Sequence, residues 1–146
     1  MPGTTPVGRA GTALAVGLTI AIVELTLITA YIHLTLGGTL FTLNALGYAA
    51  LAAALALTAI PHPFVRRFAW LPRVGLGAYA VATIVGYIVI GPYFTLGWIA
   101  KGIEVTLITL VGVDILRVYG SPKAFVRQAL DSVAPALPSR FRPTAA

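Results

Sequence analysis

The stretch Thr12–Leu36, TALAVGLTIAIVELTLITAYIHLTL, decides the fold class of this chain. Glu24 is its only formally charged residue, and the pair Gly37-Gly38 interrupts the helical pattern directly after it. A helix needs about 20 apolar residues to cross a hydrocarbon core that is about 30 Å thick. The stretch is long enough and apolar enough for this, so the sequence predicts a transmembrane helix.

Three further apolar stretches follow, at about residues 40–60, 74–90 and 96–116. Pro61-His62-Pro63 and Gly91-Pro92 separate them, and proline cannot continue a helical hydrogen-bond ladder. Of the 146 residues 58% are hydrophobic and 10% are charged, against about 25% charged residues in a typical soluble domain. The mean hydropathy is +0.92. The sequence therefore predicts an all-α membrane protein with a four-transmembrane-helix bundle.

The basic residues set the expected orientation, because Lys and Arg accumulate in cytoplasmic loops. Outside the predicted spans they occur in the N-terminal segment, between the second and third spans, and after the fourth: Arg9, Arg66, Arg67, Arg73, Arg117, Lys123, Arg127, Arg140 and Arg142. The other two connections carry no charge. We therefore expect a multi-pass protein of a bacterial cytoplasmic (inner) membrane with both termini cytoplasmic. The net charge of +6 is then a topology signal that also attracts anionic headgroups, and it does not indicate nucleic-acid binding.

The predicted spans form one domain, residues 12–116, between a short N-terminal segment, residues 1–11, and a tail, residues 117–146. In the tail, Ser121 suits an N-cap and Pro122 the first helical position. The pattern over residues 122–133 predicts an amphipathic helix that lies in the headgroup region. The alternative is a helix packed on the connection between the second and third spans. The end after Pro135 is expected to be disordered.

Small residues recur every four positions in two of the predicted spans. Such stripes allow close approach of helix backbones in lipid, where no hydrophobic force drives association. They consist of Ala45, Ala49 and Ala53 in the second span, and of Ala78, Ala82 and Gly86 in the third. We expect them to face each other or the first span inside the bundle. The alternative is a seam in a homo-oligomer or a larger membrane complex.

Ionisable side chains inside a span are costly, which makes them the first candidates for a functional site. Lys101 and Glu104 are three residues apart and can pair on one helix face. At 1.5 Å per residue, Glu24 lies within about two turns of them in depth if the first and fourth spans are neighbours. We predict an intramembrane polar cluster of Glu24, Lys101, Glu104, Asn44 and Tyr31 in the outer half of the bundle. It serves either as a proton or cation site or as a structural ion pair.

The remaining polar residues have simpler interpretations. Asp114 and Arg117 are spaced for an ion pair near the cytoplasmic end of the fourth span. His33 is expected close to the outer surface and His62 at the inner one, so the two cannot share a haem or a metal. The chain has no cysteine, which excludes thiolate metal sites and a cysteine nucleophile. No catalytic, cofactor-binding or metal-binding residues are predicted.

These observations favour a non-enzymatic accessory, assembly or scaffold subunit. The alternative is a small oligomeric proton- or cation-coupled transporter that uses the membrane carboxylates Glu24 and Glu104. A membrane enzyme is disfavoured, because the sequence has no metal triad, nucleophile–base pair or paired acids at the cytoplasmic face.

Overall fold

The computed structural model describes residues 6–134, with side chains from Gly11 onward, and the described chain contains six helices. They are α1 (Pro6–Leu36), α2 (Thr39–Leu57), α3 (Pro63–Phe68), α4 (Trp70–Ile90), α5 (Thr95–Tyr119) and α6 (Pro122–Val133). The predicted disordered end lies outside the described residues, as do the first residues of the predicted N-terminal segment.

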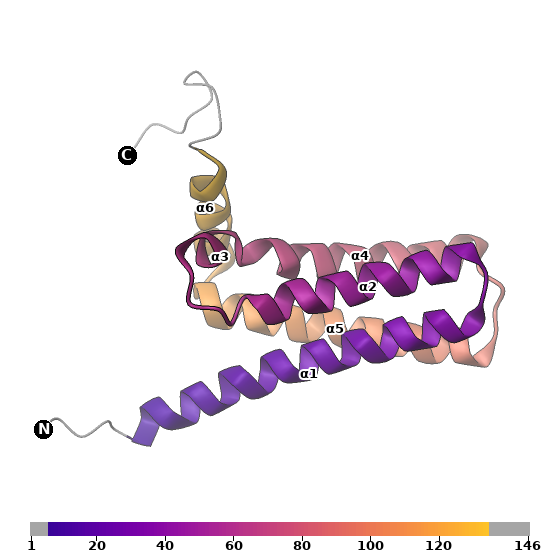
Figure 1. Ribbon diagram of the computed structural model, residues 1–146, viewed down its shortest axis with the longest axis horizontal. Coiled ribbons are helices and arrows are strands. Elements are labelled where there is room, and N and C mark those ends of the chain that lie inside the picture. Colours follow the sequence, from indigo (N-terminus) through magenta and orange to yellow (C-terminus); the bar gives the residue numbers. More distant parts are fainter. Residues whose placement is uncertain (1–5, 135–146) are drawn as a thin grey trace, which may run out of the picture.

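The four long helices α1, α2, α4 and α5 lie side by side, and successive ones run in opposite directions (Figure 1). α1 packs against α2 and α5, while α4 packs against α5 and α2. Three stretches are long and apolar enough to cross a membrane: Gly11–Leu36, Thr39–Leu57 and Pro63–Ile90, the last of which covers α3 and α4. The chain is therefore an all-helical protein with three candidate membrane-spanning helices.

The α1–α2 and α4–α5 connections lie at one end of the long helices, which we call the hairpin end. α3 and α6 lie at the opposite end, the α6 end, where α6 runs across the direction of the long helices (Figure 1). α3 was not predicted. It begins at Pro63, and the imidazole of its N-cap His62 accepts the amide hydrogen of Phe64 at 3.3 Å.

Glycine makes the tight connection between α1 and α2. Gly37 and Gly38 have φ values of 71° and 81°, in the left-handed region that residues with a Cβ rarely adopt.

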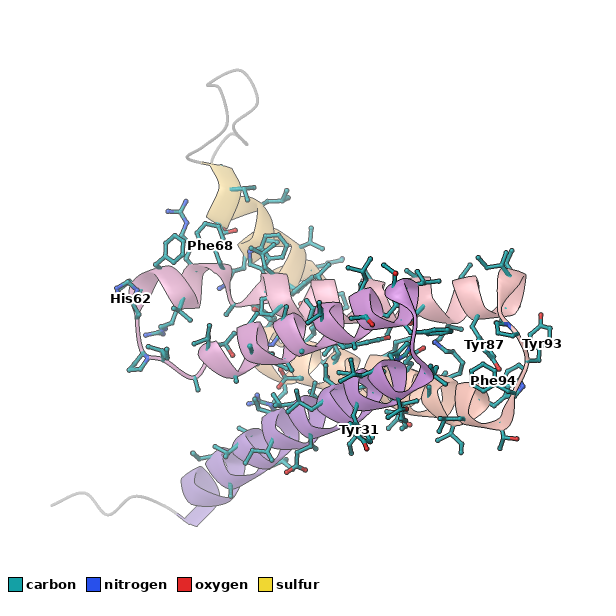
Figure 2. All side chains as sticks on the ribbon, turned by 45° about the vertical axis from the view of Figure 1, so that its right-hand side comes forward. Tyr31, His62, Phe68, Tyr87, Tyr93 and Phe94 are labelled. Carbon is teal, nitrogen blue, oxygen red and sulfur yellow. The ribbon has the colours of Figure 1, made fainter. Side chains whose placement is uncertain are left out.

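The connection between α4 and α5 is closed by Tyr87 instead. Its hydroxyl donates to the carbonyl of Phe94 at 3.1 Å and accepts from the Phe94 amide at 3.0 Å. Figure 2 shows Tyr87, Tyr93 and Phe94 together at this end.

The interior contains few large side chains, and each long helix contributes to it. The hydrophobic core consists of Ile22, Ala30, Tyr48, Leu55, Leu76, Leu107 and Val111. Large apolar side chains also lie on the outside of every long helix, among them Leu27, Leu43, Val85 and Val105. An apolar exterior of this kind is what a helix needs in order to face lipid.

The expectation that the alanine stripes face the interior is wrong for Ala78, Ala82 and Ala53, which are exposed. Of the other stripe residues Ala45 is buried, whereas Ala49 and Gly86 are half-buried. The close approach between α2 and α4 uses a different pair, because a Cβ at Gly47 would lie 2.3 Å from the hydroxyl oxygen of Tyr79. A large ring against a glycine thus takes the place of two facing rows of alanines. A seam between copies of the chain stays a prediction.

α6 is attached to α3 and to the start of α4 through Ser132. The Trp70 indole donates to the Ser132 hydroxyl at 2.8 Å, and the Arg67 guanidinium donates to the Ser132 carbonyl. Val126 and Leu130, on the apolar arc of α6, remain 53% and 50% exposed. α6 therefore contacts the connection between α2 and α4 and still presents apolar side chains on its outside.

Candidate functional site

A buried ion pair lies in the half of the molecule toward the hairpin end. Lys101 donates to Oε2 of Glu104 at 2.5 Å, and the two residues are 7% and 0% exposed. This is the pair that their spacing on one helix predicts. The other carboxylate oxygen, Oε1, has no hydrogen-bond partner among the described residues.

α1 contributes His33 to this pair. The imidazole Nε2 lies 3.8 Å from Oε1 of Glu104, and His33 is 3% exposed. Nδ1 lies 2.8 Å from the carbonyl oxygen of Thr29, which can only accept, so Nδ1 carries a hydrogen. When the ring is neutral, Nε2 therefore carries no hydrogen, and its lone pair faces Oε1 of Glu104. We call His33, Lys101 and Glu104 the Glu104 cluster; with a neutral ring, two acceptor atoms, Nε2 and Oε1, face each other in it.

Two tyrosines surround the Glu104 cluster on the side of α2 and α4. Tyr48 is fully buried, and its ring centroid lies 5.5 Å from that of His33. Its hydroxyl is 2.8 Å from Oγ1 of Thr83. Tyr79 packs edge-on against Tyr48 and donates to the side-chain carbonyl of Asn44 at 3.2 Å. Both hydroxyls are therefore hydrogen-bonded near the charged cluster, with Tyr48 fully buried and Tyr79 half-buried.

A cavity of about 310 Å³ runs from the hairpin end to the Glu104 cluster. Its polar lining comes from His33, Lys101, Asn44, Tyr79 and Thr83, and its remaining walls are mostly aromatic and aliphatic. The ammonium of Lys101 also lies 5.7 Å from the ring centroid of Tyr87. The cavity therefore has room for water or a small ligand next to His33 and Lys101, the two basic residues of the Glu104 cluster.

Two members of the predicted cluster lie elsewhere. Tyr31 is 67% exposed and points away from the other helices in Figure 2, and Glu24 is also exposed. The physical reason is helix rotation: Glu24 and His33 are nine residues apart, which places them on opposite faces of α1. His33 was not counted in the predicted cluster, yet it is 3% exposed and its imidazole lies against Glu104. Asn44 lies beside the Glu104 cluster and does not contact its charges directly.

The sequence did contain a signal for the inward face of α1. Ile22, Thr26, Thr29 and His33 share one arc of the helix, and all four are buried. Three polar residues on one arc of an otherwise apolar helix are a better guide to its interior face than one carboxylate. Tyr48 and Tyr79 left no comparable signal, because tyrosine is also common at membrane interfaces.

A second charged cluster lies toward the α6 end. Asp114 is 1% exposed and accepts from Arg73 of α4 at 2.7 Å and from Arg117 of α5 at 2.6 Å. We call these three residues the Asp114 cluster. The i, i+3 pair of Asp114 and Arg117 was predicted, whereas Arg73 was counted only as a loop charge. Because Arg73 lies in the first turn of α4, the cluster ties α4 to α5.

A groove of about 690 Å³ adjoins the Asp114 cluster. Arg73 and Arg117 line it from one side, and α1 lines it from the other through a run of residues that ends at Glu24. Glu24 therefore shares a groove with two arginines, and it is not part of the Glu104 cluster. The two carboxylates that were expected to be partners belong to two separate polar sites.

Among the residues that the structure describes, no group of three or more His, Cys, Asp or Glu side chains could hold a metal ion. Comparison of the chain with protein-family models, with curated protein sequences and with solved structures gave no match. Functional arguments for this protein therefore rest on the chemistry of the two clusters and their cavities.

Proposed function

We propose that the chain is a four-span protein of the bacterial cytoplasmic membrane, with both termini cytoplasmic, and that it serves as a non-enzymatic accessory or scaffold subunit. α5 is the proposed fourth span. Its 25 residues exceed the length that a bilayer requires. Its charged residues Lys101, Glu104 and Asp114 are buried, and Arg117 in its last turn is exposed, while Ile99, Val105 and Val113 present apolar side chains on the outside. α5 thus offers lipid an apolar face despite its charges.

The observation that carries the scaffold role is that both carboxylates of α5 are paired with basic groups of this same chain. Glu104 pairs with Lys101 of α5, and Asp114 with Arg73 of α4 as well as Arg117 of α5. A buried ion pair is a costly way to gain stability, but one that joins two helices, as Arg73 of α4 and Asp114 of α5 do, can specify which helices associate and in which register. Such a bundle is suited to present a defined outer surface to a partner.

The orientation of α6 supports a position at the cytoplasmic surface. It runs across the long helices (Figure 1), so it lies along the membrane plane if they cross the bilayer. Its exposed Val126 and Leu130 then face the headgroup region. Anionic headgroups are the proposed partners of the basic residues at this end.

Single-cysteine labelling tests the topology, because the natural chain has no cysteine to remove. Thr95→Cys at the hairpin end should react with an impermeant maleimide added to intact cells. Lys123→Cys on α6 should react only after the membrane is opened. The reverse pattern, or labelling of both positions in intact cells, would contradict the proposed orientation.

Affinity purification from native membranes tests the scaffold role. We expect a tagged chain, cross-linked in the membrane before solubilisation, to recover a defined partner or a homo-oligomer in fixed stoichiometry. Recovery of the chain alone from cross-linked native membranes would refute this role.

A proton- or cation-coupled transporter is the second candidate, and it is supported by the cavity that reaches His33 and Lys101 next to the unpaired Oε1 of Glu104. Proteoliposomes with an internal pH dye test it. Transport predicts proton flux that Glu104→Gln abolishes and that Asp131→Asn, an exposed acid of α6, leaves unchanged. Equal dye signals in protein-containing and empty vesicles would exclude proton transport.

A further inference from the structure

The groove beside the Asp114 cluster has a rim that lies open to the surface. α1 diverges from α2 and α5 toward its N-terminus (Figure 1), and the groove lies along this divergence. Val16, Ile20 and Glu24 line it and are exposed. A molecule in the surrounding lipid can therefore reach it from the side.

Glu24 is an unpaired charge within an apolar span. It lies inside the candidate membrane span Gly11–Leu36, and it makes no ion pair or hydrogen bond with the described residues. A carboxylate in such a position is expensive unless a cation or a hydrogen-bond donor meets it. The groove adds a site where such a partner can sit.

The opposite wall of the groove carries the complementary charge. Arg73 and Arg117 line it, and each has already committed donors to Asp114. Arg117 remains 32% exposed at its side chain, so part of its guanidinium is accessible. Nη1 of Arg117 and Nη2 of Arg73 make no hydrogen bond with the described residues, so each guanidinium keeps a nitrogen that can donate to a phosphate oxygen.

The charges around the groove balance, because Arg73 and Arg117 are offset by Asp114 and Glu24. A neutral surround with separate anionic and cationic walls favours a zwitterion over an anion. The rest of the lining is mostly apolar, with Ala15, Val16, Ile20 and Val23 of α1 and with Ala56 and Ala59 at and just beyond the end of α2, and its other two residues are Thr19 and Thr58. The apolar side chains suit the methylene groups of an acyl chain.

We propose that this groove binds one phospholipid with an ethanolamine headgroup, its phosphate at Arg73 and Arg117 and its ammonium at Glu24. The primary ammonium can donate hydrogen bonds to the Glu24 carboxylate, which the trimethylammonium of a choline lipid cannot do. A glycerol headgroup lacks the cation altogether. The site would select by headgroup, and it is independent of whether the protein acts as a scaffold or as a transporter.

Native mass spectrometry of the full chain in detergent tests the site. Phosphatidylethanolamine, phosphatidylcholine and phosphatidylglycerol with the same acyl chains are titrated separately. A charge-assisted hydrogen bond corresponds to about a tenfold change in affinity, so we expect the ethanolamine lipid to bind about tenfold more tightly than the other two. Glu24→Gln should remove this preference, while Arg117→Gln should weaken the binding of all three lipids.

Two exposed α6 residues supply matched controls, Asp131→Asn for the acid and Arg127→Gln for the base. Both should leave the preference intact, because neither residue lines the groove. The proposal is overturned if Glu24→Gln binds the ethanolamine lipid as wild type does, if the glycerol lipid binds as tightly as the ethanolamine lipid, or if Arg117→Gln changes nothing. Glu24 is exposed, so its variant tests the site without removing a buried contact.

Discussion

Nε2 of His33 on α1 lies 3.8 Å from Oε1 of Glu104 on α5, and both side chains are almost wholly buried. The contact joins the first long helix to the last, residues far apart in the sequence. It also brings a third ionisable group to the Lys101–Glu104 pair, which would otherwise involve α5 alone. The same contact both holds α1 against α5 and supplies the only imidazole at the Glu104 cluster.

Removing one partner of the Lys101–Glu104 pair should lower the free energy of unfolding strongly, whereas replacing both partners with apolar residues should lower it little. Lys101→Met leaves a fully buried carboxylate without its donor, so the free energy of unfolding should fall by about 3–5 kcal/mol. Adding Glu104→Leu should recover most of this loss, since an apolar pair needs no compensation. SDS-induced unfolding followed by circular dichroism measures both variants, with Lys123→Met as an exposed control. A Lys101→Met variant as stable as wild type would contradict the assignment.

The two arginines that bind Asp114 should contribute unequally. The Arg73 side chain is 7% exposed and that of Arg117 is 32% exposed. Arg73→Gln should therefore lower the free energy of unfolding by roughly 2–4 kcal/mol, and Arg117→Gln by less than about 1 kcal/mol, because solvent screens the more exposed pair. The same unfolding assay ranks them. A larger loss of stability in Arg117→Gln than in Arg73→Gln would mean that Arg117 is the main partner of Asp114.

Two glycines of α5 provide a test of helix packing near the hairpin end. A Cβ at Gly97 would lie 2.5 Å from the Tyr87 hydroxyl oxygen, whereas nothing lies within 4 Å of a Cβ at Gly102. Gly97→Ala should lower the free energy of unfolding by about 1–3 kcal/mol, because Tyr87 is held by Phe94 and cannot retreat freely. Gly102→Ala should raise it by about 0.5–1 kcal/mol through the helix propensity of alanine. Similar values for the two variants would argue against this packing.

The attachment of α6 depends on a hydrogen bond from Trp70 to Ser132. Trp70→Phe keeps an aromatic ring but removes the donor, which costs about 1 kcal/mol, or about fivefold in the docking equilibrium. Amide hydrogen exchange over residues 122–133 should accelerate by about this factor. Trp98→Phe changes the other tryptophan, near the hairpin end, and should leave these amides unaffected. Unchanged exchange in Trp70→Phe would show that α6 is held by other contacts.

The parts of this protein that the sequence predicted are local ones. Length and apolar composition are enough to predict helices that can cross a bilayer, because the bilayer sets the required length. Gly37-Gly38 marks a tight turn since both residues need positive φ. Lys101 and Glu104 meet because three residues separate them on one helix.

The rotation of each helix about its own axis was not predictable in this way. The apolar residues of α1 lie on nearly every face and do not distinguish the side that meets α5 from the side that meets lipid, so only the arc of Thr26, Thr29 and His33 marks its inward face. Glu24 appeared to be the functional residue because it is charged, and the alanine stripes appeared to be the packing faces because they are small. Tyr48 and His33 fill the interior instead, with the half-buried Tyr79 packed against Tyr48.

By itself, the sequence determined an all-helical chain with apolar helices long enough to span a membrane, and two ion pairs within α5, Lys101–Glu104 and Asp114–Arg117. The tertiary structure alone decided that His33 meets Glu104, that Arg73 joins Asp114, and that Glu24 faces a groove. The physical reason is that every apolar face of a helix is equally compatible with contact with lipid. Which face of a helix turns inward is then decided by how well its side chains pack against the neighbouring helices and by the charges that those helices carry. The sequence of one helix does not contain this information.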